Sequence, residues 1–137
     1  MTEDAGVVFQ ESIMEGIAYS VRHRIKVMEN ELGVKIDEVR IVGGGARSPI
    51  WRRIMADIYN KSIAFPGGEE IECLGDAILA GIAIGRYKNA IQASSELINI
   101  IDRKDPIKEN VDSYSKLFTI FVNLYDQLRN SFNDIAE

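Results

Sequence analysis

Residues 38–58 read EVRIVGGGARSPIWRRIMADI, and this stretch says most about how the chain folds. The β-branched run Glu38–Val42 leads directly into three glycines, which predicts a strand that ends in a glycine loop. Ser48 and Pro49 then form a strong helix start. Serine caps a helix N-terminus well, and proline at the first helical position gives up an N–H that has no partner there. We therefore expect a strand, a glycine loop and a helix in direct succession.

The segments on either side of this stretch have helical periodicity. Val7–Leu32 places an apolar residue at every third or fourth position, as one face of a long helix requires. Ser94–Ile101 predicts a short amphipathic helix, and Val111–Ile135 predicts a long helix with an aromatic stripe. These stripes are typical of core or packing surfaces.

The segment Glu70–Tyr87 follows a second expected strand, Ser62–Phe65, and is apolar nearly all round. It contains Gly75, Gly81 and Gly85, and each interior glycine costs a helix roughly 1 kcal/mol relative to alanine. The pattern fits a helix on which another backbone packs closely. It fits a helix buried in the core equally well.

This order of elements predicts an α/β fold. Two strands joined through one helix should pair in parallel with a right-handed crossover. Two parallel strands offer too little surface for about five helices. We expect residues 1–137 to form one incomplete domain that begins at or just before its first helix, with its opening strands absent.

Composition and charge exclude several functional classes. The net charge is −5 and no Lys/Arg cluster occurs, which argues against a nucleic-acid partner. Cys73 and His23 are the only residues of their types, so neither an intrachain disulfide nor a Cys/His zinc set is possible. The N-terminus lacks the features of a secretion signal, and the longest apolar run, Ala77–Gly85, is too short to span a membrane. We expect a cytoplasmic protein.

The glycine loop is the candidate binding site. Glycines let a ligand approach the backbone, and a helix start offers N–H groups and a partial positive charge. The stretch is not a P-loop, because the Gly-Lys-Ser/Thr ending is absent, and Ser48 stands where the dinucleotide fingerprint has its third glycine. A glycine turn that binds no ligand fits the pattern as well as a nucleotide site does.

Residues 43–57 as a whole resemble the adenosine motif of the FGGY carbohydrate kinases, most closely the xylulokinase-like members. Three other stretches agree in the same order: SIMEGIAY at 12–19, CLGDAILA at 73–80, and the Asp105-Pro106 break before an aromatic helix. Asp76 departs from a usual small residue, and Asn60 stands where glycine is common.

This resemblance implies the C-terminal domain of an ATP-dependent sugar kinase, with a ribonuclease-H-like fold of the actin/hexokinase type. Gly43, Gly44 and Gly45 would lie against the adenosine and the α-phosphate of ATP or ADP. Ala46 would border the base, and Ser48 would cap the helix beside the purine. The roles of Arg47 and Glu15 stay open.

In such kinases Mg²⁺ assists transfer of the γ-phosphoryl group to a sugar or polyol hydroxyl. The phosphate-binding turn, the aspartate base and most sugar contacts fall outside the matched stretches. The chain alone is therefore predicted to be inactive, with no catalytic residue and no metal ligand, and the sugar is not determined. We also expect self-association through a strand edge and apolar helix faces that include Ile13, Ile17, Ile78 and Ile82.

Two other functions compete with this hypothesis. A non-catalytic regulatory or scaffold domain could keep the fold without binding nucleotide. A dinucleotide-dependent oxidoreductase is disfavoured by the missing third glycine. Stabilisation by ATP, ADP or NAD would distinguish the three.

Overall fold

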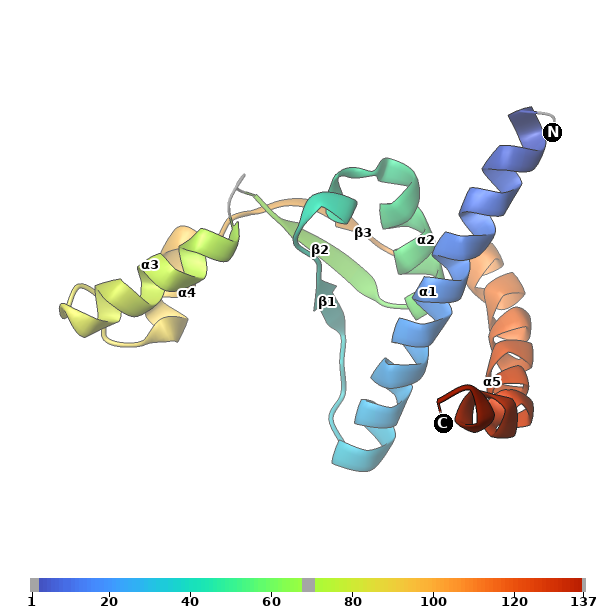
Figure 1. Ribbon diagram of the computed structural model, residues 1–137. Helices are drawn as coiled ribbons and strands as arrows, with labels where there is room; N and C mark the ends of the chain where they lie inside the picture. The colour runs from blue at the N-terminus through green and yellow to red at the C-terminus, as the bar shows by residue number, and fades with distance from the viewer. Residues whose placement is uncertain (1–2, 68–70, 137) are drawn as a thin grey trace.

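The computed structural model describes residues 3–67 and 71–136 (Figure 1). The elements follow one another along the chain as α1 Glu3–Leu32, β1 Glu38–Arg40, the 3-10 turn η1 Gly44–Arg47, α2 Pro49–Tyr59, β2 Ser62–Pro66, α3 Ile71–Ala83, α4 Ala90–Leu97, β3 Ile100–Lys104 and α5 Lys108–Ala136. The α/β fold class and the long first and last helices are as predicted.

The sheet has the order β1-β2-β3, with β2 in the centre. β1 pairs with β2 in parallel, Val39 opposite Ile63, and α2 is the helix that joins them. The predicted parallel pair is thus confirmed. The expected first strand is shorter than predicted: β1 ends at Arg40, although the Ile41 N–H still donates to the Ala64 carbonyl at 3.0 Å.

The expectation of only two strands is wrong, because β3 pairs antiparallel with β2, Arg103 opposite Ala64. The sequence predicted a helix over Ser94–Ile101. The helix α4 instead begins at Ala90 and ends at Leu97, and the chain becomes extended at Ile100. β3 is a short edge strand rich in charged residues. It pairs with β2, a segment more than thirty positions earlier, 37 positions for Phe65 and its antiparallel partner Asp102. The periodicity of residues near β3 gives no information about this distant partner strand.

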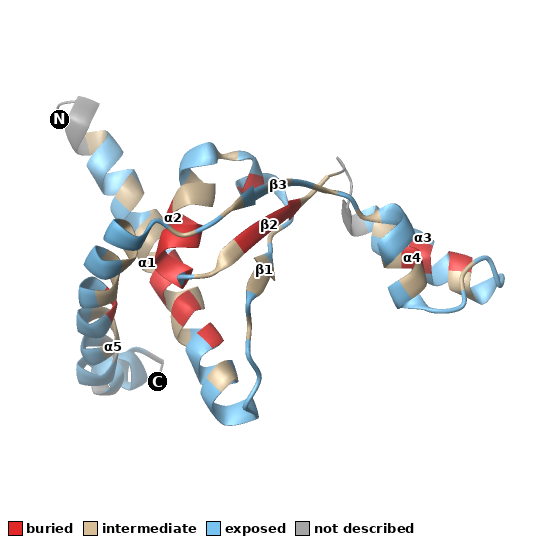
Figure 2. Ribbon diagram, turned by 180° about the vertical axis from the view of Figure 1, so that it is seen from behind, coloured by how far each residue is buried: buried red, intermediate tan, exposed pale blue. Residues whose placement is uncertain are grey.

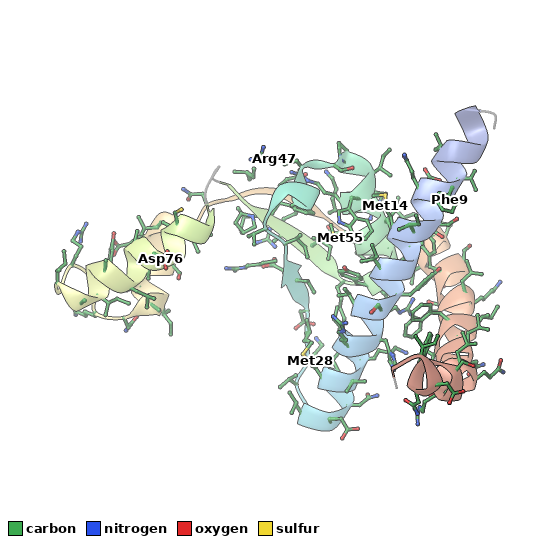
Figure 3. All side chains as sticks on the ribbon, in the orientation of Figure 1. Phe9, Met14, Met28, Arg47, Met55 and Asp76 are labelled. Atoms are coloured by element: carbon green, nitrogen blue, oxygen red, sulfur yellow. The ribbon has the colours of Figure 1, made fainter. Side chains whose placement is uncertain are left out.

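The core lies where α1, α2, α5 and β2 meet, as the concentration of buried residues shows (Figure 2). α2 contributes Met55 and Ile58, β2 contributes Ile63 and Phe65, and these four side chains are almost completely buried. The aromatic rings of Tyr19 on α1 and of Phe118 on α5 close the cluster, with centroids 6.2 Å apart. Figure 3 shows Met55 between α2 and the sheet.

Helices α3 and α4 project from one end of the sheet and pack on each other; we call residues 71–97 the arm (Figure 1). Neither environment predicted for the glycine-bearing helix is found. A Cβ at Gly75 would meet nothing within 4 Å, and the close neighbour of Gly81 is the Tyr87 ring, not another backbone. The helix also ends at Ala83, before the predicted Tyr87, and Gly85 lies beyond it with φ 75°.

None of the helices in the described ranges is both long enough and apolar enough to cross a membrane.

Candidate functional site

The glycine loop leaves β1 and turns into α2 at the surface of the molecule. Gly43 has φ 91° and ψ 178°, and the chain then winds through one 3-10 turn, Gly44–Arg47. Within it the Ala46 N–H donates to the Gly43 carbonyl at 3.1 Å, and the Ser48 N–H donates to the Gly45 carbonyl at 3.3 Å. Ala46 is buried, whereas the three glycines are exposed. The loop therefore presents main chain to the outside.

The three glycines differ in backbone conformation and in the space around them. Gly43 has the positive φ that side-chain-bearing residues rarely adopt, so its backbone needs glycine. Gly45 lies beside the indole of Trp51, where a Cβ would sit 3.4 Å from Cδ1 and Nε1. At Gly44 a Cβ would meet nothing within 4 Å, and φ is not positive. Neither backbone conformation nor packing within the described chain accounts for glycine at this position.

The start of α2 has the cap that the sequence predicted. Ser48 is in an extended conformation, and its Oγ accepts a hydrogen bond from the Trp51 N–H at 3.3 Å. Pro49 has no N–H, and the Arg52 N–H donates to the Ser48 carbonyl at 3.0 Å. The Ile50 N–H lies too early in α2 to have an acceptor within the helix, and the helix dipole adds partial positive charge at this end. At the other end, Asn60 adopts the predicted left-handed conformation with φ 51°.

A hydrogen bond from Arg52, a residue that the sequence analysis missed, holds the loop through its main chain. Arg52 reaches back from α2, and its Nε donates to the Ala46 carbonyl. Its Nη1 donates to Asp102 Oδ2 on β3 at 2.8 Å, and its guanidinium carbon lies 4.4 Å from the centre of the Phe65 ring. A basic residue in the first turn after a glycine loop is a visible signal. Its acidic partner could not be found, because β3 was not predicted as a strand.

Asp102 supplies the negative charge that holds the Arg52 guanidinium. Hydrogen bonds from Lys104, at 3.1 Å, and from Arg52 hold the pKa of its carboxyl below the usual range. The carboxylate therefore stays ionised at neutral pH and remains an acceptor for Arg52.

The two residues whose roles were open lie in different environments. Arg47 is exposed at the outer side of the loop and points away from the sheet (Figure 3). Glu15 lies on α1, away from the loop, and its Oε1 accepts a hydrogen bond from the Tyr114 hydroxyl at 2.9 Å. Glu15 thus joins α1 to α5, which is a packing role.

Residues 3–67 and 71–136 contain no group of three or more His, Cys, Asp or Glu side chains that could hold a metal ion. The functional groups of the candidate site are therefore the main chain of the loop, the start of α2 and the Arg52–Asp102 support.

The glycine loop thus lies at the surface between a parallel strand and a capped helix, as in one class of α/β domain. The model of the FGGY family of carbohydrate kinases, C-terminal domain, matches residues 3–84, from α1 through the end of α3. The chain belongs to this family. The family resemblance seen in the sequence is thereby confirmed.

Individual relatives agree with the family match. The gluconokinase of Bacillus subtilis is 31% identical over 124 residues, which cover 90% of this chain and 24% of the relative. The solved xylulose kinase of Brucella ovis has the same fold over 89% of this chain and 25% of its own, with a TM-score of 0.78 at 23% identity. A glycerol kinase of Plasmodium falciparum, solved with ADP, matches 82% of this chain and 23% of its own, with a TM-score of 0.68 at 19% identity.

The chain thus spans about a quarter of the length of the kinases it matches. The relatives it matches are named as kinases of gluconate, of xylulose and of glycerol.

Proposed function

We propose that this chain is the nucleotide-binding C-terminal part of an ATP-dependent carbohydrate kinase, and that its glycine loop binds the adenosine end of ATP or ADP. Gly43, Gly44 and Gly45 lie against the adenosine and the α-phosphate, Ala46 borders the base, and Ser48 lies beside the purine.

The observation that carries the proposal is the exposed main chain of the glycine loop, with open space at Gly44, directly before the capped start of α2. A ligand can approach the backbone closely there, because the glycines have no side chains to block it. The partial positive charge at the start of α2 suits a phosphate group on that ligand. The family supplies the chemical class, and one solved relative of this fold carries ADP.

In the complete kinase this site contributes binding energy that holds ATP in line with the sugar hydroxyl. Mg²⁺ would neutralise charge on the transferring phosphoryl group. The chain's own residues supply the adenosine contacts and leave the phosphoryl transfer and the sugar contacts to the rest of the kinase. A cytoplasmic location stays a prediction from the sequence.

An NMR titration of the ¹⁵N-labelled chain with ADP tests the site. We expect shifts at Gly43–Ser48 and a dissociation constant of roughly 1 mM, because part of a nucleotide cleft binds weakly. Gly44→Val should abolish these shifts by filling the open space. Gly75→Val is the matched control, because a Cβ at Gly75 on the arm also meets nothing within 4 Å. ADP binding by the Gly44→Val variant at wild-type affinity would refute the site.

Thermal-shift series with ATP, ADP and NAD separate the competing functions. Stabilisation by adenine nucleotides favours the kinase part, and no stabilisation by any of them favours a regulatory or scaffold domain. Stabilisation by NAD alone favours an oxidoreductase. A coupled ADP-release assay with gluconate, xylulose and glycerol should show no turnover by this chain alone.

A further inference from the structure

The contacts of Arg52 fix its guanidinium from three sides. Nε donates to the Ala46 carbonyl in the loop, Nη1 donates to Asp102 on β3, and the guanidinium carbon lies over the Phe65 ring on β2. Only about a fifth of the Arg52 side chain, 19%, is exposed. A partly buried guanidinium with an ionised partner and an aromatic neighbour has little freedom to move.

A hydrogen bond to the Ala46 carbonyl restrains the conformation of the whole loop. Ala46 is the buried member of the 3-10 turn, and its N–H already donates to the Gly43 carbonyl at 3.1 Å. Fixing the carbonyl of the same residue therefore fixes the turn that carries Gly44 and Gly45. A loop that is ordered before the ligand arrives loses less conformational entropy on binding.

We propose that Arg52 is a positioning residue for the glycine loop, and that Asp102 holds Arg52 in the orientation that presents the loop backbone to an adenine nucleotide. The inference rests on the proposed function, since the nucleotide is the ligand that the loop is positioned for. It assigns a role to Asp102 and to β3, which lie outside the glycine motif and outside the segment matched by the family model.

Arg52→Lys and Asp102→Asn test the proposal. Lysine keeps the charge but has a single ammonium group, which cannot reproduce the fork that joins Ala46 to Asp102. Asparagine keeps the shape of Asp102 and removes its charge.

Arg53→Lys is the matched control. Arg53 is the next residue of the same helix, but its guanidinium pairs with Asp57 at 2.7 and 3.0 Å, away from the loop. The control therefore disturbs a comparable arginine–aspartate pair without touching the Ala46 carbonyl.

Two quantities are measured for each variant of the full 137-residue chain. Amide hydrogen exchange at Ala46 and Ser48 without nucleotide reports the order of the loop, and the NMR titration with ADP reports affinity. We expect Arg52→Lys to speed loop exchange and to weaken ADP binding, each by about fivefold, the effect of one lost hydrogen bond. Asp102→Asn should act in the same direction. Arg53→Lys should lower the melting temperature and leave both quantities within about twofold of wild type.

Loop exchange and ADP affinity that are the same in Arg52→Lys as in wild type would overturn the inference and leave the proposed function standing. An Arg53→Lys variant that loosens the loop as much as Arg52→Lys would also overturn it, because the effect would then be general destabilisation. If the wild-type chain itself binds no ADP, the proposed function fails.

Discussion

Asp57, on α2, is a carboxylate with only 1% of its surface exposed. It accepts hydrogen bonds from Arg53 Nε and Nη2, from the Ile107 N–H at 2.8 Å and from Asn110 Nδ2 at 2.7 Å. Ile107 immediately precedes α5, and Asn110 lies in its first turn. Asp57 therefore joins the helix of the candidate site to the start of the last helix.

We predict that Asp57→Ala lowers the free energy of unfolding by about 2–4 kcal/mol, because it removes the buried acceptor shared by Arg53, the Ile107 N–H and the Asn110 side chain. Asp126→Ala is the control, since Asp126 forms an exposed i,i+3 pair with Arg129 at 2.9 Å and its loss should cost under about 0.5 kcal/mol. Urea denaturation measures both. Equal effects of the two substitutions would contradict the role assigned to Asp57.

Two buried tyrosines predict instability at high pH. Burial raises the pKa of Tyr59 from 10.0 to about 12, and burial, with a smaller effect of Glu15, raises the pKa of Tyr19 to about 12. The folded state therefore favours the protonated phenols. This stability is fully present below pH 10 and is lost as the pH rises through 12.

We expect the free energy of unfolding to fall between pH 9 and pH 11 by about 1 kcal/mol for each of these tyrosines. Tyr59→Phe should reduce that fall by about the same amount, since phenylalanine does not titrate. Urea denaturation of both proteins at the two pH values is the measurement. An unchanged pH dependence in Tyr59→Phe would mean that Tyr59 titrates normally in the folded state.

At the scale of the elements, the arm is attached through two chain segments that meet at its base. The Gly67 N–H donates to the Asn99 carbonyl at 2.8 Å, and the space a Gly67 side chain would need is filled by Ile101. α3 and α4 pack on each other, and no residue of either helix whose burial is described belongs to the core cluster.

Replacement of residues 68–98 by a short glycine-containing turn should therefore leave the rest of the described fold intact. We expect the free energy of unfolding to change by no more than about 1 kcal/mol. No residue of 73–98, where burial is described, belongs to the core cluster, and a short β-hairpin connection suits the antiparallel β2–β3 pair. Circular dichroism and urea denaturation would check this. Loss of cooperative unfolding would show that the arm is needed to keep β3 on the sheet.

At the scale of the whole molecule, α1 carries an uncovered apolar face. Ile13 and Ile17 are 50% and 53% exposed, and Phe9 lies further along the same helix (Figure 3). β1 is an edge of the sheet, as expected. The prediction that Ile78 belongs to an exposed apolar face is wrong. Ile78 is only 7% exposed, because the packing of α3 on α4 buries it.

We predict that the chain self-associates at micromolar concentration through this face of α1, since an apolar patch of this kind is costly to leave in water. Ile13→Lys combined with Ile17→Lys should shift the chain to a monomer in light scattering after size exclusion. Ile84→Lys, on the more exposed connection of the arm (83%), should not. A wild-type chain that is a clean monomer and unfolds cooperatively would contradict the prediction.

The sequence predicted those features that depend on interactions between residues close together along the chain. Helix periodicity located α1 and α5, Ser48 and Pro49 located the start of α2, and the strand–helix–strand order implied the parallel pair, because these signals act within a few turns of chain. The glycine loop of the candidate site was found in the same way.

Contacts between segments far apart in the chain could not be predicted from the sequence. Arg52 and Asp102 are 50 positions apart, and Asp57 and Asn110 are 53 positions apart. β3 is a strand only because β2 offers it an open edge, and Ile78 is buried only because α4 folds back on α3. In each case the stabilising partner is brought near by packing of the whole chain, and no local pattern carries that information.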